Sequence, residues 1–223
     1  MARHFKTAQQ YVLSTLRAEI LKGLPPNTHL RQEEVAARLN VSTTPVHEAF
    51  RDLRAEGLVS IDPNKGVLTR GLTATDVAEI YGLRMVLEPM LAKKACEHIT
   101  ASQLETAASC HETMGATASP ETWAVLNEEF HEHLVVSQAE TRLFAMVGAL
   151  SVVARPYVEL AMHVQQDIMG NNSAEHAGLL AAYRSRDAEA VYAQTRSHLE
   201  NTLAAVVQCV GQRPQAAVTE AQA

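Results

Sequence analysis

The sequence predicts a mainly α-helical protein, with a winged helix-turn-helix at the N-terminus followed by an all-α antiparallel bundle of about six helices. Residues that favour helix, such as Ala, Leu, Glu, Gln and Arg, are frequent among the 223 residues. Aromatic residues make up only 4%, which is not typical of a β-sandwich or propeller. The β-prone runs are short and lie before Gly71, directly after three short helical segments.

The charge of the chain divides it into two parts. Through Arg70 there are 10 Lys and Arg against 7 Asp and Glu, whereas the remainder has 9 against 18. We therefore expect two domains with different partners, residues 1–71 and 72–211, the first of them suited to a polyanion. Residues 212–223 carry no pattern and are expected to form a disordered tail.

The composition also indicates whether the chain folds and in which compartment it works. Apolar residues make up 47% and charged residues 20%, so wholesale disorder is excluded. The three cysteines form no CxxC pair and no disulfide framework, which fits a reducing cytoplasm. No apolar signal region follows the N-terminal charges, and the longest weakly polar run, Leu143–Ala154, is too short to span a bilayer. A cytoplasmic protein without a membrane segment is expected.

The first part is predicted to contain three helices and a hairpin. The helices are expected at about Thr7–Lys22, Gln32–Leu39 and Thr43–Glu56, the last with Ser42 as N-cap and Pro45 in its first turn. Two β-prone runs, 58–61 and 67–69, surround an Asn/Gly turn. This order is typical of a winged helix-turn-helix that binds DNA. The alternative is a small α/β subdomain that binds no nucleic acid.

The second part is predicted to be entirely helical. Short loops between helices favour antiparallel packing of neighbouring helices. The sequence Gly170-Asn171-Asn172 is expected to end the fourth helix before the fifth begins. The first of the six helices is expected to begin at Thr73 or Thr75 and to end at about His98. The others are expected at about Ser102–Met114, Pro120–Gln138, Thr141–Ile168, Ser173–Arg184 and Ala188–Val210.

Histidines recur on the apolar faces of three of these helices. Asn127 and His131 lie one turn apart on the face that carries Trp123, Phe130 and Leu134. His176 and His198 lie on the apolar faces of the last two helices. Three inward histidines and one oxygen ligand favour a divalent metal site. The alternative is a set of hydrogen-bonded core histidines.

Arg84 also interrupts an apolar helix face, so its guanidinium needs a partner. One interpretation is an ion pair with Glu88 on the same helix. The other is a bidentate clamp for the carboxylate of a ligand.

The stretch VSTTPVHEAFRDLRAEGLV, with LKGLPPNTHL before it and Gly66 after it, resembles the GntR family of bacterial transcription regulators. The resemblance implies a recognition helix in the major groove of a two-fold DNA operator. The family usually has arginine where this chain has Thr43 and His47, so its usual guanine contacts are not expected at both positions. The implied DNA-facing residues are Arg31, Ser42, Thr43, Thr44, Pro45, His47, Arg51, Arg54, Lys65 and Gly66.

The segments YGLRMVLEPMLAKKA, NEEFHEHLVVSQAE and EHAGLLAAYRSRDAEAVYAQTRSHLE resemble the FCD effector domain of the FadR-type branch of that family. The resemblance implies a homodimer that binds a small organic acid and acts as a repressor. It implies zinc or nickel at Asn127, His131, His176 and His198, with asparagine in place of the usual aspartate. Arg84, and more weakly Arg155 and Tyr157, are the implied effector-binding residues.

Two other functions compete with this interpretation. One is a metal-dependent helical enzyme fused to a DNA-binding head, but the chain has no HExxH, GxSxG or Gly-rich phosphate motif. Glu128, Glu129 and Glu132 face away from His131, which leaves no obvious general base. We therefore expect no enzyme activity. The other is a structural DNA-binding protein whose bundle ignores ligands.

Overall fold

The computed structural model describes residues 7–62, 66–71, 73–164 and 167–211. The chain forms two compact units, one covering the described residues up to Thr73 and the other covering Ala74–Gly211. The division falls two residues after the boundary expected from the sequence. The expected tail, 212–223, lies outside the described residues.

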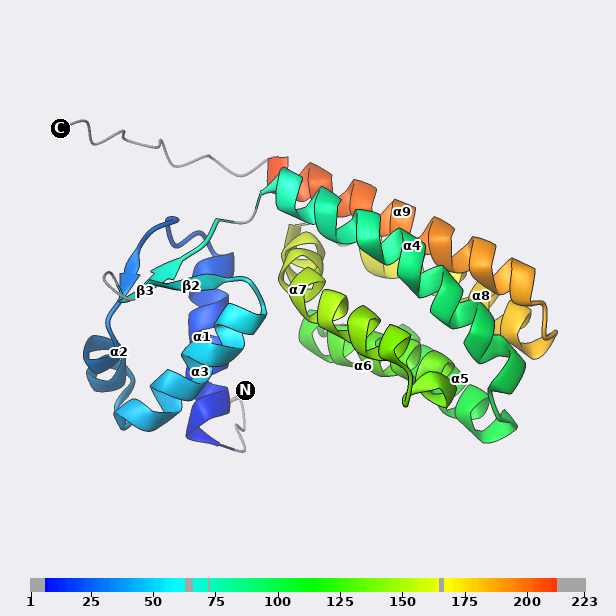
Figure 1. The fold of residues 1–223 in the computed structure, drawn as a ribbon, viewed down its shortest axis with the longest axis horizontal. Coiled ribbons are helices and arrows are strands. Elements are labelled where there is room, and N and C mark those ends of the chain that lie inside the picture. The colour runs from blue at the N-terminus through cyan, green and yellow to red at the C-terminus, as the bar shows by residue number, and fades with distance from the viewer. Residues whose placement is uncertain (1–6, 63–65, 72, 165–166, 212–223) are drawn as a thin grey trace. The chain divides into compact units, whose positions relative to one another are not determined.

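The first unit is a winged helix-turn-helix (Figure 1). A three-stranded antiparallel sheet in the order β1-β3-β2 accompanies its three helices. The bounds are α1 Ala8–Leu21, β1 His29–Leu30, α2 Gln32–Leu39, α3 Thr43–Ala55, β2 Val59–Asp62 and β3 Gly66–Thr69. The sequence predicted every element except β1, whose two residues are too short to show a pattern and which forms by pairing with Val67 and Leu68.

Local interactions and backbone conformation decide where these helices begin and end. The Thr7 side chain accepts a hydrogen bond from the Gln10 N–H and caps α1. Asn40 adopts the left-handed conformation, with φ of 54°, and ends α2. Gly57, with φ of 72°, turns the chain out of α3 into β2, a conformation that favours glycine.

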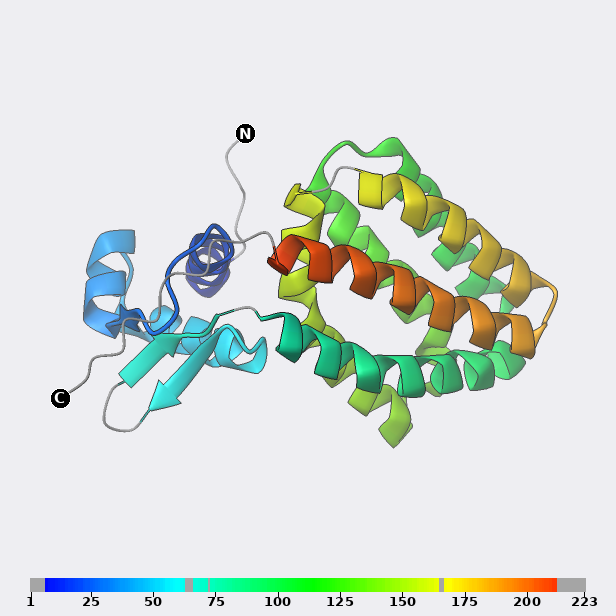
Figure 2. The ribbon, with the colours of Figure 1, turned by 90° about the horizontal axis from the view of Figure 1, so that it is seen from above.

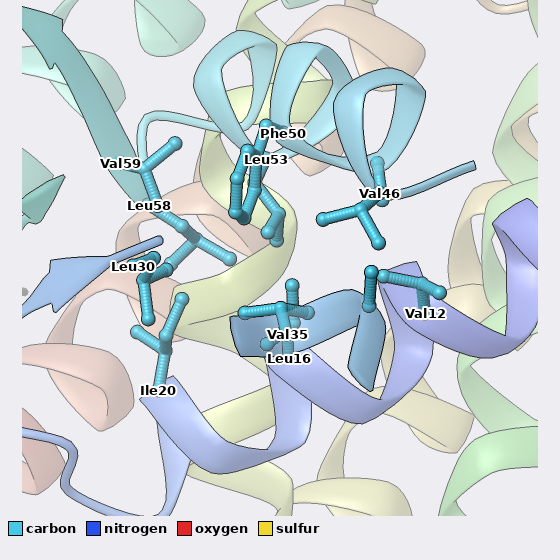
Figure 3. Close-up of a cluster of buried hydrophobic side chains, with 12 residues drawn as sticks. Val12, Leu16, Ile20, Leu30, Val35, Val46, Phe50, Leu53, Leu58 and Val59 are labelled. Atoms are coloured by element: carbon cyan, nitrogen blue, oxygen red, sulfur yellow. The ribbon is translucent and has the colours of Figure 1, made fainter. Parts of the chain in front are cut away.

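A single apolar core holds the first unit together (Figure 3). Val12 and Leu16 of α1 meet Val46 and Leu53 of α3, and all four side chains are fully buried. Burial of each such side chain contributes about 1.5–3 kcal/mol. The core leaves the opposite face of α3 exposed.

The second unit is the predicted six-helix bundle. Figures 1 and 2 show α4 and α9 lying side by side, and this pair makes the most extensive helix contact of the unit. The bounds are α4 Ala74–His98, α5 Ala101–Ala116, α6 Pro120–Val135, a 3-10 turn at Val136–Gln138, α7 Arg142–Val164, α8 Asp167–Arg184 and α9 Ala188–Gly211.

One predicted boundary is wrong. The expected break at residues 170–172 is absent, because α8 runs from Asp167 to Arg184 without interruption. The contacts of α8 with α9 and α5 outweigh the weak helix propensity of the Gly-Asn-Asn sequence. Asn172 is itself buried.

One described helix is long and apolar enough to cross a membrane, judged by length and composition alone. It covers Arg142–Met162, a longer stretch than the run considered in the sequence. A single helix of this kind is weak evidence for a membrane segment, because core helices of soluble proteins pass the same test. Here the helix packs on α4, α9 and α6.

Candidate DNA-reading surface and metal site

The exposed face of α3 carries the residues that the sequence predicted to meet DNA. Thr43, Thr44, His47, Arg51 and Arg54 are all exposed, whereas the core residues lie on the opposite face. The side-chain amide of Gln32 donates to the Thr43 carbonyl at 2.9 Å and joins the start of α2 to the start of α3. The contact joins residues eleven positions apart, so the local patterns of the sequence do not predict it.

The other predicted DNA-facing residues surround this helix. Ser42 is the exposed N-cap of α3, and Pro45 is half-buried in its first turn. Arg31 precedes α2 with its side chain 75% exposed and contacts Glu34. Gly66 begins β3 with φ of 76°, and Lys65 lies outside the described residues.

In the second unit, three histidines from three helices meet. His131 of α6, His176 of α8 and His198 of α9 each offer a nitrogen, and these atoms all lie within 4.8 Å of one another. The three ring centroids are 5.1–5.2 Å apart. Metal–nitrogen bonds of about 2.1 Å place ligand atoms roughly 3–4 Å apart, so small side-chain rotations bring the rings onto one ion.

The state of these rings suits a metal ion. His176 is 1% exposed, and neither of its ring nitrogens has a hydrogen-bond partner. Burial, with smaller contributions from His198 and His111, lowers the pKa of His176 to about 2. Burial, followed by His176, His198 and Arg84, places the pKa of His131 well below its usual value. Both imidazoles are therefore neutral at physiological pH, which is the form that binds metals.

A carboxylate orients the third histidine. Glu175 Oε2 lies 2.5 Å from His198 Nδ1, and its other oxygen accepts from the Asn201 amide at 2.6 Å. Burial alone would raise the pKa of Glu175, but these hydrogen bonds lower it below its usual value. With Nδ1 engaged, His198 keeps Nε2 for a metal ion. This role of Glu175 cannot be read from the sequence, because the contact joins two helices.

Asn127 supplies a fourth candidate ligand. It lies one turn before His131 on α6, and its Oδ1 is buried without a hydrogen-bond partner. Trp123, Phe130 and Leu134 are buried, as the helical pattern predicted. An unpartnered buried amide oxygen is costly, and coordination to a cation would satisfy it.

The predicted effector residues have different surroundings. Arg84 pairs with Glu88 at 2.5 and 3.3 Å, and its guanidinium carbon lies 4.6 Å from the centre of the Tyr81 ring. The ion pair considered from the sequence is therefore formed, and the charge of Arg84 is one of the smaller causes that lower the pKa of His131. Arg155 instead pairs with Glu128, which is half exposed, and no described contact joins it to the histidines.

Tyr157, the remaining predicted effector residue, is buried in α7. A cavity of about 240 Å³ lies between α5, α6 and α8, and His176 is one of the residues that line it. His111 of α5 lines it, and the sequence analysis did not identify this residue. The helical spacing in the sequence could have indicated His111, because it shares a face of α5 with the buried Ala107 and Met114.

Family models match both units. Residues 8–68 match the model of bacterial regulatory proteins of the gntR family, and residues 79–201 match the FCD domain. The second match alone spans more than half of the chain.

Curated relatives agree with these matches. The chain is 27% identical over 196 residues to the transcriptional repressor RspR of Escherichia coli, covering 86% of this chain and 85% of the relative. It is 34% identical over 122 residues to a helix-turn-helix regulator from the TAR-I ttuE-ttuC' intergenic region of Agrobacterium vitis, covering 52% and 71%. These relatives are transcription regulators, not enzymes.

Solved structures share the fold. A GntR regulator from Pseudomonas syringae is 28% identical and covers 90% of this chain and 85% of its own, with a TM-score of 0.52. Escherichia coli McbR/YncC, at 21% identity, covers 92% and 99% with a TM-score of 0.69 and supports the fold alone. The two family matches, in the order found along the chain, show that this protein belongs to the GntR family of transcription regulators, in the FadR-like branch that carries a C-terminal FCD domain.

Proposed function

We propose that this protein is a homodimeric, ligand-responsive repressor that leaves its operator when a small carboxylate binds at a metal site in its helical unit. The observation that carries the proposal is the group of His131, His176 and His198, whose ligand nitrogens lie within 4.8 Å of one another. Both ring nitrogens of His176 are buried without a hydrogen-bond partner. A bound ligand would shift the helical unit from one conformation toward another. In a dimer this would change how well the two winged helix-turn-helix units, the heads, fit a two-fold operator. Repression also has precedent in the Escherichia coli relative.

Zinc or nickel would be held by the three histidines and Asn127, and would supply a positive charge and open coordination positions. Histidines bind a metal ion as neutral imidazoles and asparagine binds it as a neutral amide, so these four ligands would bring no negative charge to the ion. A carboxylate, with a neighbouring hydroxyl or carbonyl oxygen, would occupy those positions. Arg84 is close enough to reinforce this preference for an anion, while Glu88 holds its guanidinium in place.

The partner in the homodimer is proposed to contact α4. Leu83, Val86 and Met90 follow one another at helical spacing and are 44–55% exposed, although all three are large and apolar. A continuous apolar stripe of this kind is typical of a contact surface. A two-fold operator calls for two copies of the chain. A cytoplasmic location follows from this function.

A titration tests the effector part of the proposal. Carboxylic acids are screened by thermal shift on zinc-loaded and chelated protein, and the strongest binder is titrated into operator complex. We expect release of DNA that requires the metal, and weakening by about tenfold or more in Arg84→Ala. Arg196→Ala is the control, because Arg196 forms an exposed i,i+4 pair with Glu200. Metal-independent binding that Arg84→Ala leaves unchanged would contradict this effector site.

A second experiment tests the head. His47→Ala is expected to cost about 1–3 kcal/mol at the cognate operator and to relax preference at one base pair. Arg54→Ala is expected to weaken binding to all sequences and to reduce the salt slope by about one. Fluorescence anisotropy on operator variants at several salt concentrations measures both. Unchanged affinity and preference in His47→Ala would remove His47 from base recognition.

A further inference from the structure

We propose that the helical unit has a second ligand subsite, in the cavity between α5, α6 and α8 that shares His176 with the metal site, and that this subsite takes an uncharged single-ring molecule with hydrogen-bonding substituents. The cavity has a volume of about 240 Å³. A dry cavity of about 150 Å³ is enough for benzene, so this space accommodates a substituted ring.

Unpartnered polar atoms beside the cavity point to a ligand. His176 has two buried ring nitrogens without a partner, and one metal ion can satisfy only one of them because the two point in different directions. His111 Nδ1 is likewise buried without a partner, and the two rings are 5.9 Å apart. Both residues line the cavity. A buried polar atom left unpaired is costly, so an occupant that pairs with these groups is stabilised.

The lining selects the class of occupant. Trp123 and Met114 provide an aromatic and a polarizable apolar wall, while Thr117, Ser173 and His111 provide hydrogen-bonding groups. The described lining residues include no Lys, Arg, Asp or Glu. A charged group would therefore find no counter-ion among these residues, and a purely apolar molecule would leave the imidazole nitrogens unpaired. A ring that carries hydroxyl groups meets both requirements.

The chain contains a built-in reporter for this subsite. Trp123 is its one tryptophan, and it lines the cavity with its ring stacked at 6.2 Å on His176. Tryptophan fluorescence, excited at its red edge, therefore monitors occupancy directly in the full-length chain. The measurement depends neither on DNA nor on a carboxylate effector.

The probe is resorcinol, a benzene ring with two hydroxyl groups, compared with toluene and benzoate. In chelated and in zinc-loaded protein, resorcinol is expected to change Trp123 fluorescence saturably, and to bind more tightly than either comparison compound. His111→Leu is expected to weaken resorcinol binding about tenfold, the loss of one neutral hydrogen bond. Ser173→Ala, a smaller change at the same cavity, is the second variant if His111→Leu does not fold. His98→Leu is the control, since His98 is exposed on α4.

The outcomes separate the subsite from the proposed function on which its regulatory meaning rests. No saturable response to resorcinol would overturn the subsite and leave the carboxylate site intact. Saturable binding that neither cavity variant weakens, or that benzoate matches, would overturn the assignment to these residues. Loss of metal-dependent carboxylate binding with resorcinol binding retained would instead overturn the proposed function alone.

Discussion

His198 lies between a carboxylate and the proposed metal ion, and this position decides which of its nitrogens is available. Glu175 holds Nδ1, so the ring is fixed in one orientation with Nε2 free for coordination. Glu175 is the residue directly before His176 on α8. One turn of this helix therefore contributes a ligand and the group that orients a ligand on α9.

At this scale we predict that Glu175→Gln lowers the affinity for zinc or nickel by about 10–100-fold while leaving all three histidines in place. The glutamine side chain of the variant lacks the negative charge of Glu175. It can also donate as well as accept a hydrogen bond, so it does not hold His198 in one tautomer. Competition against a chromophoric chelator measures the effect. Glu200→Gln is the control, because Glu200 is half exposed on α9 and pairs with Arg196. Equal affinity in wild type and Glu175→Gln would show that Glu175 does not orient the ligand.

At the scale of the elements, an ion pair joins α1 to the end of α3 within the winged helix-turn-helix head. Both oxygens of Glu56, at the C-terminal end of α3, accept hydrogen bonds from the Arg17 guanidinium of α1. Glu56 is only 5% exposed and Arg17 18%. A second pair, Arg38 with Glu19, joins α2 to α1 but is far more exposed. Burial is the difference that separates their energetics.

We predict that Glu56→Gln destabilises the head by about 2–4 kcal/mol, because it removes the charge of the carboxylate that pairs with a largely buried guanidinium. Glu19→Gln, which breaks the exposed pair, is expected to cost less than about 1 kcal/mol. Hydrogen exchange of the α1 and α3 amides in the full chain reports on this unit separately from the bundle. Similar losses in the two variants would show that burial does not control the strength of these pairs.

At the scale of the whole molecule, the buried histidines link the stability of the helical unit to pH. The pKa of His176 is about 2 in the folded protein and that of His131 is also well below its usual value. Unfolding restores a pKa near 6.5 to both, so the unfolded chain binds more protons in acid. The stabilisation is therefore complete above about pH 6.5 and is lost as the pH falls toward the folded values.

We predict that, in the presence of chelator, the free energy of unfolding of this unit falls as the pH is lowered below about 6.5, with a slope that approaches about 1.4 kcal/mol per pH unit for each of these two histidines as the unfolded chain becomes protonated. Urea unfolding followed by Trp123 fluorescence measures it, since the one tryptophan lies in this unit. His176→Phe is expected to remove part of the slope. A stability that does not change over this pH range would mean that neither histidine is held neutral.

The sequence alone determined the order of the helices and the faces they bury, because both follow from local periodicity and capping. It placed Asn127 and His131 on the buried face of α6 and set Thr43, His47 and Arg51 on the exposed face of α3, as the structure has them. Only tertiary structure decided which groups from different helices meet: the three histidines, Glu175 beside His198, and His111 beside the cavity. It also kept α8 continuous through residues 170–172. The physical reason is that spacing along one helix fixes directions around its axis, whereas distances between helices depend on how all the side chains pack.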